Sequence, residues 1–129
     1  MAEKIKALLI DDEAGFTQLL KMNLEKSGRF EVEIQNDSTQ ALATARSFRP
    51  DIVLLDVVMP GMDGGDVQAQ FESDPVLGQT PIIMLTALVD SAELSEGAVA
   101  QSGSSVVLPK PIDLELLNRV VNELLGIEA

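Results

Sequence analysis

The sequence contains no cysteine and no histidine, and these two absences remove several classes of chemistry at once. Without cysteine, the chain can form neither a disulfide scaffold nor a thiolate metal site. Without histidine, it can hold no Ser-His-Asp triad, no imidazole-ligated zinc and no imidazole general base. Any catalysis must therefore come from carboxylates, hydroxyls, lysine or a bound metal ion.

Positive charge and long apolar segments are also scarce. The formal net charge of −12 disfavours direct contact with nucleic acid, because phosphates would be repelled. No apolar run approaches the roughly 18 residues of a membrane span. The opening MAEKIKALLIDDE has too short an apolar run for a signal peptide and continues into acids, so we expect a cytoplasmic protein. With 129 residues, 46% of them hydrophobic, we expect one domain covering residues 1–129.

Segments typical of strands and of helices alternate along the chain. Short apolar runs predict strands at residues 5–10, 31–35, 52–55, 81–86 and 106–108. Helices are predicted at residues 14–26, 64–73 and 92–101. A further helix is predicted to start at a cap on Asp37 or Ser38 and to end at Arg49-Pro50, and the last helix is predicted to start at a cap on Asp113. Five β–α repeats predict an α/β fold: a five-stranded parallel sheet, (βα)5 doubly wound, in a flavodoxin-like three-layer sandwich.

Polar residues follow four of the predicted strands at their carboxyl ends, where parallel sheets bind ligands. These residues are Asp11, Asp12 and Glu13 after the first strand, Asp56 after the third, Thr86 at the end of the fourth and Lys110 after the fifth. Converging carboxylates repel one another, by about 4 kcal/mol for a pair at about 4 Å and an effective dielectric of about 20. We therefore expect Mg²⁺ among them. Carboxylate, metal, lysine and threonine together indicate in-line phosphoryl transfer to an aspartate.

Each of these residues taken alone has a simpler interpretation. Asp12 could cap the first helix, Asp56 could merely end a strand, and Lys110 could be a solvated surface lysine. Thr86 is an ordinary strand residue. The functional hypothesis is favoured because four separate strand ends carry the residue types that the chemistry needs.

In this arrangement the chain resembles a receiver domain of two-component response regulators, of the single-domain chemotaxis-regulator type. The resemblance covers essentially the whole chain and rests on four motifs in order: IDDE (10–13), LLDVVMPGMDG (54–64), LTA (85–87) and PKP (109–111). It implies that Asp56 accepts a phosphoryl group from the phosphohistidine of a sensor histidine kinase or phosphotransfer protein. It also implies a downstream protein target whose binding depends on phosphorylation.

The resemblance further implies a role for individual residues. Asp12, Asp56 and the backbone carbonyl of Val58 would ligate Mg²⁺ directly, and Asp11 would act mainly through water. Thr86 and Lys110 would contact the phosphoryl oxygens, with a cis peptide between Lys110 and Pro111. Val58 and Leu88 would flank the entrance to the phosphoryl group, and since neither can orient a water by hydrogen bonding, we expect slow self-dephosphorylation.

One position departs from the family pattern. Three residues before the lysine the family usually has an aromatic residue that swings inward when the threonine moves, and here that residue is Val107. Valine is small and stiff at χ1, which puts this form of switching in doubt. The last predicted helix also carries a second apolar line, Ile112, Leu116 and Val120. We interpret that line as a wide core face, the alternative being a docking surface or a phosphorylation-dependent homodimer.

Two other functions are alternatives. A Mg²⁺-dependent phosphatase with an aspartate nucleophile would need a second acid two residues after the nucleophile, where Val58 stands. A receiver-like interaction module would never turn over phosphate, and the complete acidic, threonine and lysine set argues against it. A P-loop nucleotidase lacks its motif here. We expect a signalling domain that catalyses only its own phosphorylation and dephosphorylation.

Overall fold

The computed structural model describes residues 4–56, 64–86, 100–102, 105–109 and 112–126. Along the chain the elements are β1 (Ile5–Ile10), α1 (Ala14–Lys26), β2 (Phe30–Gln35), a 3-10 turn η1 (Ser38–Gln40), α2 (Ala41–Phe48), β3 (Ile52–Asp56), α3 (Gly64–Ser73), β4 (Ile82–Thr86), β5 (Ala100–Ser102), β6 (Ser105–Pro109) and α4 (Leu114–Leu125). Within these residues no helix is long and apolar enough to cross a membrane.

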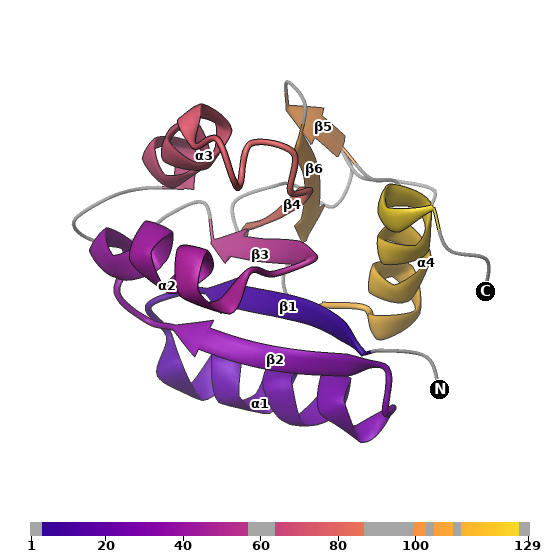
Figure 1. Cartoon of the computed structure of the whole chain (residues 1–129). Helices are drawn as coiled ribbons and strands as arrows, with labels where there is room; N and C mark the ends of the chain where they lie inside the picture. The colour runs from indigo at the N-terminus through magenta and orange to yellow at the C-terminus, as the bar shows by residue number, and fades with distance from the viewer. Residues whose placement is uncertain (1–3, 57–63, 87–99, 103–104, 110–111, 127–129) are drawn as a thin grey trace.

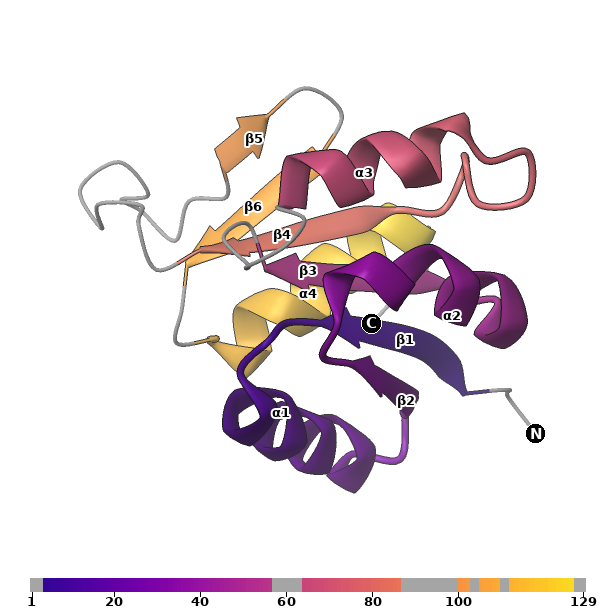
Figure 2. The same cartoon turned by 90° about the vertical axis from the view of Figure 1, so that its left-hand side faces the viewer.

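The strands form one sheet in the order β2-β1-β3-β4-β6-β5. The first five of these strands pair in parallel, which confirms the predicted parallel sheet. Helices cover both faces, with α1 and α4 on one side and α2 and α3 on the other (Figures 1 and 2). Because the chain runs outward from β1 to β2 and then returns to β3, the β1–β3 boundary is the topological switch point of the sheet.

Alternate strand residues supply the two cores, since successive side chains of a strand point to opposite faces. Ala7 and Leu9 of β1 pack with the α1 and α4 side, whereas Leu8 and Ile10 pack with the α2 and α3 side. All five residues of β3 are buried. This burial on both faces explains the continuous apolar run of β3. The carboxylate of Asp56 comes at the end of that run, at the carboxyl edge of the sheet.

Local sequence accounts for most helix boundaries. Helix α1 has the predicted bounds, and Gly28 follows it in the left-handed region with φ of 80°. Asp37 caps the 3-10 turn η1, which leads directly into α2, and Arg49 ends α2 with φ of 55°. Asp113 caps α4 by accepting hydrogen bonds from the main-chain N–H groups of Glu115 and Leu116 at 2.9 and 3.3 Å.

The second apolar line of α4 belongs to the core, as we had interpreted it. Val120 is buried, and Ile112 and Leu116 are partly buried against the same cluster. Within the residues that the structure describes, this line therefore widens the packed face of α4.

The prediction of a helix at residues 92–101 is wrong for the part of it that the structure describes. Ala100 and Gln101, the end of the helix predicted at 92–101, lie in β5, which pairs antiparallel with β6 at the edge of the sheet. Residues 92–99 lie outside the described residues. Ala100 and Gln101 are good helix formers, so the local sequence favours a helix, but pairing with β6 satisfies their backbone groups at the sheet edge and decides the structure. The Gly103-Ser104 pair, typical of short hairpin connections, is the signal that sequence reasoning overlooked.

Candidate functional site

Three carboxylates meet at the switch point of the sheet. Asp11 and Asp12 directly follow β1, and Asp56 is the last residue of β3, the strand beside it. One carboxylate oxygen from each residue lies within 4.8 Å of the other two. Asp11 and Asp56 are 1% and 6% exposed, while Asp12 is exposed to solvent. The fold thus brings together three of the residues predicted for the site.

This geometry concentrates negative charge at a place where two of the three carboxylates are buried. Two unit charges about 4.8 Å apart repel by about 3 kcal/mol at an effective dielectric of about 20, and three carboxylates make three such pairs. A hard divalent cation relieves that repulsion, and carboxylate oxygens are the ligands that Mg²⁺ prefers. The donor set at this end of the sheet therefore fits a magnesium ion.

The simple alternative for Asp12 does not match the structure. The residue at the N-cap position of α1 is Glu13, one residue further along the chain. Asp11 serves the turn instead, because its Oδ1 accepts a hydrogen bond from the main-chain N–H of Glu13 at 3.0 Å. Asp12 is left with its carboxylate in the acidic cluster.

Thr86 and Val107 lie on the neighbouring strands. Thr86 ends β4, which pairs with β3, and it is 4% exposed. Val107 is in β6, opposite Met84 of β4, and is buried in the core cluster on the α2 and α3 side. The other residues predicted for the site, Val58, Leu88, Lys110 and Pro111, lie outside the described residues.

Sequence reasoning missed two residues beside the cluster, Asn36 and Thr17. The side-chain amide of Asn36 donates to the main-chain oxygen of Asp11 at 2.7 Å and to the Thr17 hydroxyl at 3.0 Å. Asn36 directly follows β2, so it stands at a carboxyl strand end, as the aspartates do. The same rule that found the aspartates could have found it.

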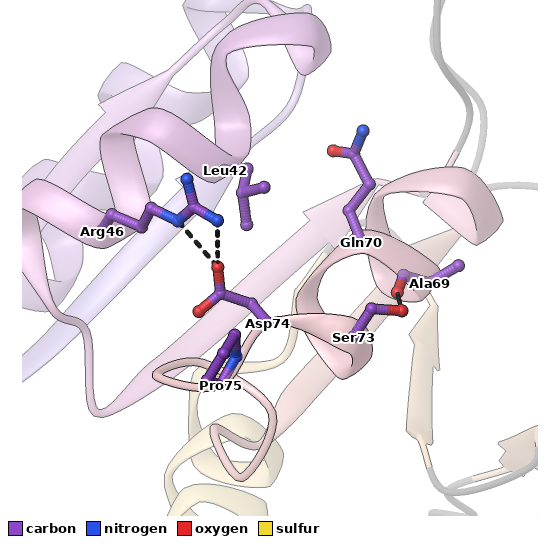
Figure 3. Close-up of a pocket in the computed structure, with 7 residues that line it drawn as sticks. All are labelled: Leu42, Arg46, Ala69, Gln70, Ser73, Asp74 and Pro75. Carbon is purple, nitrogen blue, oxygen red and sulfur yellow. Dashed lines mark hydrogen bonds and ion pairs between the residues drawn. The ribbon is translucent and has the colours of Figure 1, made fainter.

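A separate hollow of about 410 Å³ lies between α2 and α3, where both helices end (Figure 3). Its lining includes Leu42, Gln70 and Pro75. It contains none of the clustered aspartates, because the helices of this fold end near the amino ends of the strands. We therefore assign the chemistry to the acidic cluster and not to the hollow.

An ion pair crosses this hollow and joins α2 to the turn after α3. Asp74 Oδ2 accepts hydrogen bonds from Nε and Nη2 of Arg46 at 2.7 and 2.6 Å (Figure 3). Oδ1 of Asp74 accepts from the main-chain N–H groups of Val76 and Leu77. Burial by itself raises the pKa of Asp74. The hydrogen bonds and the charge of Arg46 outweigh burial and hold that pKa below its usual range.

The sheet order and the acidic switch point define an α/β domain of the receiver type, and comparison with known proteins agrees. The model of the response regulator receiver domain matches residues 7–122. The chain belongs to this family, the receiver domains of two-component response regulators. The comparisons favour neither the phosphatase nor a receiver-like module outside phosphotransfer signalling.

Curated relatives are longer than this chain. The DNA-binding response regulator MtrA of Mycobacterium tuberculosis (strain H37Rv) is 38% identical over 116 residues, which are 89% of this chain and 48% of MtrA. Response regulator Rre1 of Synechocystis is 33% identical over 126 residues, 98% of this chain and 54% of Rre1. Response regulator PleD of Caulobacter vibrioides is 39% identical over 108 residues, 84% of this chain and 23% of PleD. The chain thus spans about half or less of the length of these relatives.

Solved receiver structures of similar size share the fold. The chemotaxis protein CheY4 of Vibrio cholerae superposes with a TM-score of 0.78 at 30% identity, covering 95% of this chain and 99% of CheY4. A response regulator from Chloroflexus aurantiacus gives a TM-score of 0.78 at 28% identity, covering 96% of this chain and 99% of that protein.

Proposed function

We propose that Asp56 accepts a phosphoryl group from the phosphohistidine of a sensor histidine kinase or phosphotransfer protein, and that phosphorylation switches binding to a downstream protein target. The observation that carries this proposal is the convergence of three carboxylates at the switch point, with Asp56 at the end of the buried strand β3. The chain has no histidine, so the donor imidazole has to come from another protein. We assign this function to residues 1–129 as one receiver domain.

The reaction requires little covalent chemistry from the chain itself. An oxygen of the Asp56 carboxylate attacks phosphorus in line, a P–O bond to the aspartate forms, and the bond from phosphorus to the donor nitrogen breaks with the nitrogen keeping the electron pair. The Thr86 hydroxyl, at the end of the strand beside Asp56, donates a hydrogen bond to a phosphoryl oxygen. The Lys110 ammonium contributes positive charge to the same group.

Asp11, Asp12 and Asp56 would hold Mg²⁺ together with the main-chain oxygen of Val58. Asp12 and Asp56 would ligate the ion directly, and Asp11 would act through water. When bound, the ion supplies positive charge that offsets the charge of the carboxylates and of the phosphoryl oxygens. Strand β3 places the nucleophilic oxygen of Asp56 at the mouth of the sheet, where a donor protein can reach it.

The domain works in signalling and turns over only its own phosphoryl group. Val58, two residues after Asp56, offers no carboxylic acid to protonate a leaving group, so a general phosphatase activity is not proposed. The partners are proteins of the cytoplasm, and the charge of −12 disfavours direct contact of this domain with nucleic acid. A second, phosphorylated copy of the chain is a further partner to test.

Phosphorylation by a small acyl phosphate tests the proposal without a kinase. With Mg²⁺ present, we expect the wild type to gain the mass of one phosphoryl group, and we expect Asp56→Asn to gain none. Excess chelator should prevent the gain. Glu123→Gln, which changes an exposed acid of α4, is the control and should react like the wild type. Equal phosphorylation of Asp56→Asn and wild type would contradict the proposal.

A further inference from the structure

A small network of hydrogen bonds holds the loop that carries Asp11 and Asp12. The amide nitrogen of Asn36 lies 2.7 Å from the main-chain oxygen of Asp11. A carbonyl oxygen can only accept a hydrogen bond, so the group of Asn36 that faces it must be the amide NH₂. The register of β1 and β2 explains the contact, because Ile10 pairs with Gln35 and the next residues on the two strands are Asp11 and Asn36.

This hydrogen bond acts on the peptide that links the two aspartates. The carbonyl of Asp11 and the N–H of Asp12 belong to one planar unit, so holding the carbonyl sets the direction in which Asp12 leaves β1. The carboxylate of Asp11 is held separately through the N–H of Glu13. Asp12 itself is exposed, and the structure gives its side chain no hydrogen bond or ion pair among the described residues. Its position in the cluster therefore depends on the backbone.

Thr17 anchors Asn36 to the first turn of α1. The Thr17 hydroxyl accepts from the Asn36 amide at 3.0 Å and lies 3.1 and 3.3 Å from the carbonyl oxygens of Ala14 and Glu13, to which it donates. Thr17 is 1% exposed, so its hydroxyl is held in place by packing as well as by hydrogen bonds. The buried Thr17 side chain therefore holds the Asn36 amide in place.

Resting on the proposed function, we infer that Asn36, anchored by Thr17, is a positioning residue for the divalent cation site. It orients the Asp11–Asp12 peptide so that the Asp12 carboxylate stays within reach of Asp11 and Asp56. Residues that orient metal ligands without touching the metal contribute about 10- to 100-fold to metal affinity. Asn36 is exposed overall, so its truncation removes the contact without opening a cavity in the core.

The chain offers a matched control at the same strand end. Gln35, the residue before Asn36, donates from its side-chain amide to the Thr44 hydroxyl of α2 at 2.8 Å. This is the same kind of hydrogen bond, but it leads away from the aspartates. Thr44→Ala removes it and leaves the Asp11 loop untouched. If Asn36 only stabilised the end of β2, Asn36→Ala and Thr44→Ala would weaken Mg²⁺ binding to the same extent.

The experiment measures Mg²⁺ binding by calorimetric titration at a temperature where every variant is folded by circular dichroism. We expect the dissociation constant to rise about tenfold in Asn36→Ala and to stay at the wild-type value in Thr44→Ala. Thr17→Val, which keeps the shape and loses the hydroxyl, should also bind more weakly, and Thr17→Ser should bind nearly like wild type. The Thr17 pair tests the inference independently if Asn36→Ala does not fold.

A second measurement needs no metal. In chelator, the backbone amide resonance of Asp12 should shift in Asn36→Ala, because the carbonyl of the same peptide has lost its donor, and it should not shift in Thr44→Ala.

Wild-type Mg²⁺ affinity in both Asn36→Ala and Thr17→Val overturns the inference, as does an equal loss of affinity in Thr44→Ala. In those cases Asp56 phosphorylation would still stand. If the wild type binds no Mg²⁺, the metal site of the proposed function fails and the inference fails with it.

Discussion

Val107 occupies the position where the family usually has an aromatic side chain. It is 9% exposed and packs against the cluster that includes Met84 and Ile82. A valine in a strand has one stiff torsion, so it cannot move between an inward and an outward position as a ring can. We therefore expect that any coupling between the proposed phosphoryl site and the surface does not depend on a moving ring at this position.

We propose that Val58 and Leu88 flank the entrance to the phosphoryl group and thereby set the lifetime of the phosphorylated form. Hydrolysis needs a water in line with the aspartyl phosphate, and the side chains of Val58 and Leu88 have no group that could hold it. We expect the double variant Val58→Asn with Leu88→Glu to lose its phosphoryl group faster than wild type, each tenfold in rate corresponding to about 1.4 kcal/mol of barrier. The measurement is the decay of phosphoprotein after the donor is removed. Decay of the wild type at the rate of the polar variant would show that the entrance is open to water.

Among the elements, helix α1 protects one edge of the sheet. Val32 of the edge strand β2 donates its N–H to Glu25 at 3.1 Å and accepts a hydrogen bond at its carbonyl from Lys21 at 2.9 Å. The two side chains also pair with each other across one helical turn at 3.5 Å. An edge strand whose backbone groups are occupied is a poor template for another chain, so this contact guards against edge-to-edge association.

Helix α2 is tied to the turn after α3 through Arg46 and Asp74, and this tie should depend on pH. The pKa of Asp74 lies below its usual range in the folded protein, so the ionised carboxylate stabilises the fold at pH values above the ordinary aspartate pKa of about 3.9. That contribution is lost as the pH falls through the lower, folded pKa. We expect Asp74→Asn to be less stable than wild type at neutral pH and the difference to shrink under acid conditions.

Urea unfolding midpoints at pH 7 and at about pH 3, close below the ordinary aspartate pKa, measure this difference. Glu123→Gln changes an exposed carboxylate of α4 and serves as the control, for which we expect little change in midpoint at either pH. A gap between Asp74→Asn and wild type that is as wide in acid as at neutral pH would contradict the role of the charged pair.

For the molecule as a whole, we expect the acidic cluster to link stability to divalent cations. The folded state gathers three carboxylates, whereas the unfolded chain separates them, so Mg²⁺ should bind the folded state preferentially. At about ten times its dissociation constant, Mg²⁺ contributes about 1.4 kcal/mol by mass action, which corresponds to a rise of about 5 °C in Tm for a domain of this size.

Thermal unfolding in Mg²⁺ and in chelator, at matched ionic strength, measures this rise. Asp12→Ala should reduce the response to Mg²⁺, and Glu123→Gln, on the exposed side of α4, should leave it unchanged. Equal Tm values for the wild type with and without Mg²⁺ would count against the metal site.

Most of the architecture could be predicted from local sequence because its causes are local. The stripe of Phe16, Leu20 and Leu24 and the glycine at position 28 determine where α1 begins and ends. The apolar run that ends in Asp56 predicts a strand buried on both faces. The order of strands and helices then brings the carboxyl ends together, so the meeting of Asp11, Asp12 and Asp56 also followed from the sequence.

Tertiary structure alone decided what depends on the register and pairing of distant segments. The strand β5 exists because Ala100–Ser102 pairs with β6, and this pairing overrides the helix preference of Ala100 and Gln101. The pair between Arg46 and Asp74 joins residues that are 28 positions apart. The contact of Asn36 with Asp11, 25 positions apart, depends on the pairing of Ile10 with Gln35. Sequence determined which chemical groups reach the mouth of the sheet, and strand register decided which of them touch, because hydrogen bonds need alignment to within a few tenths of an ångström.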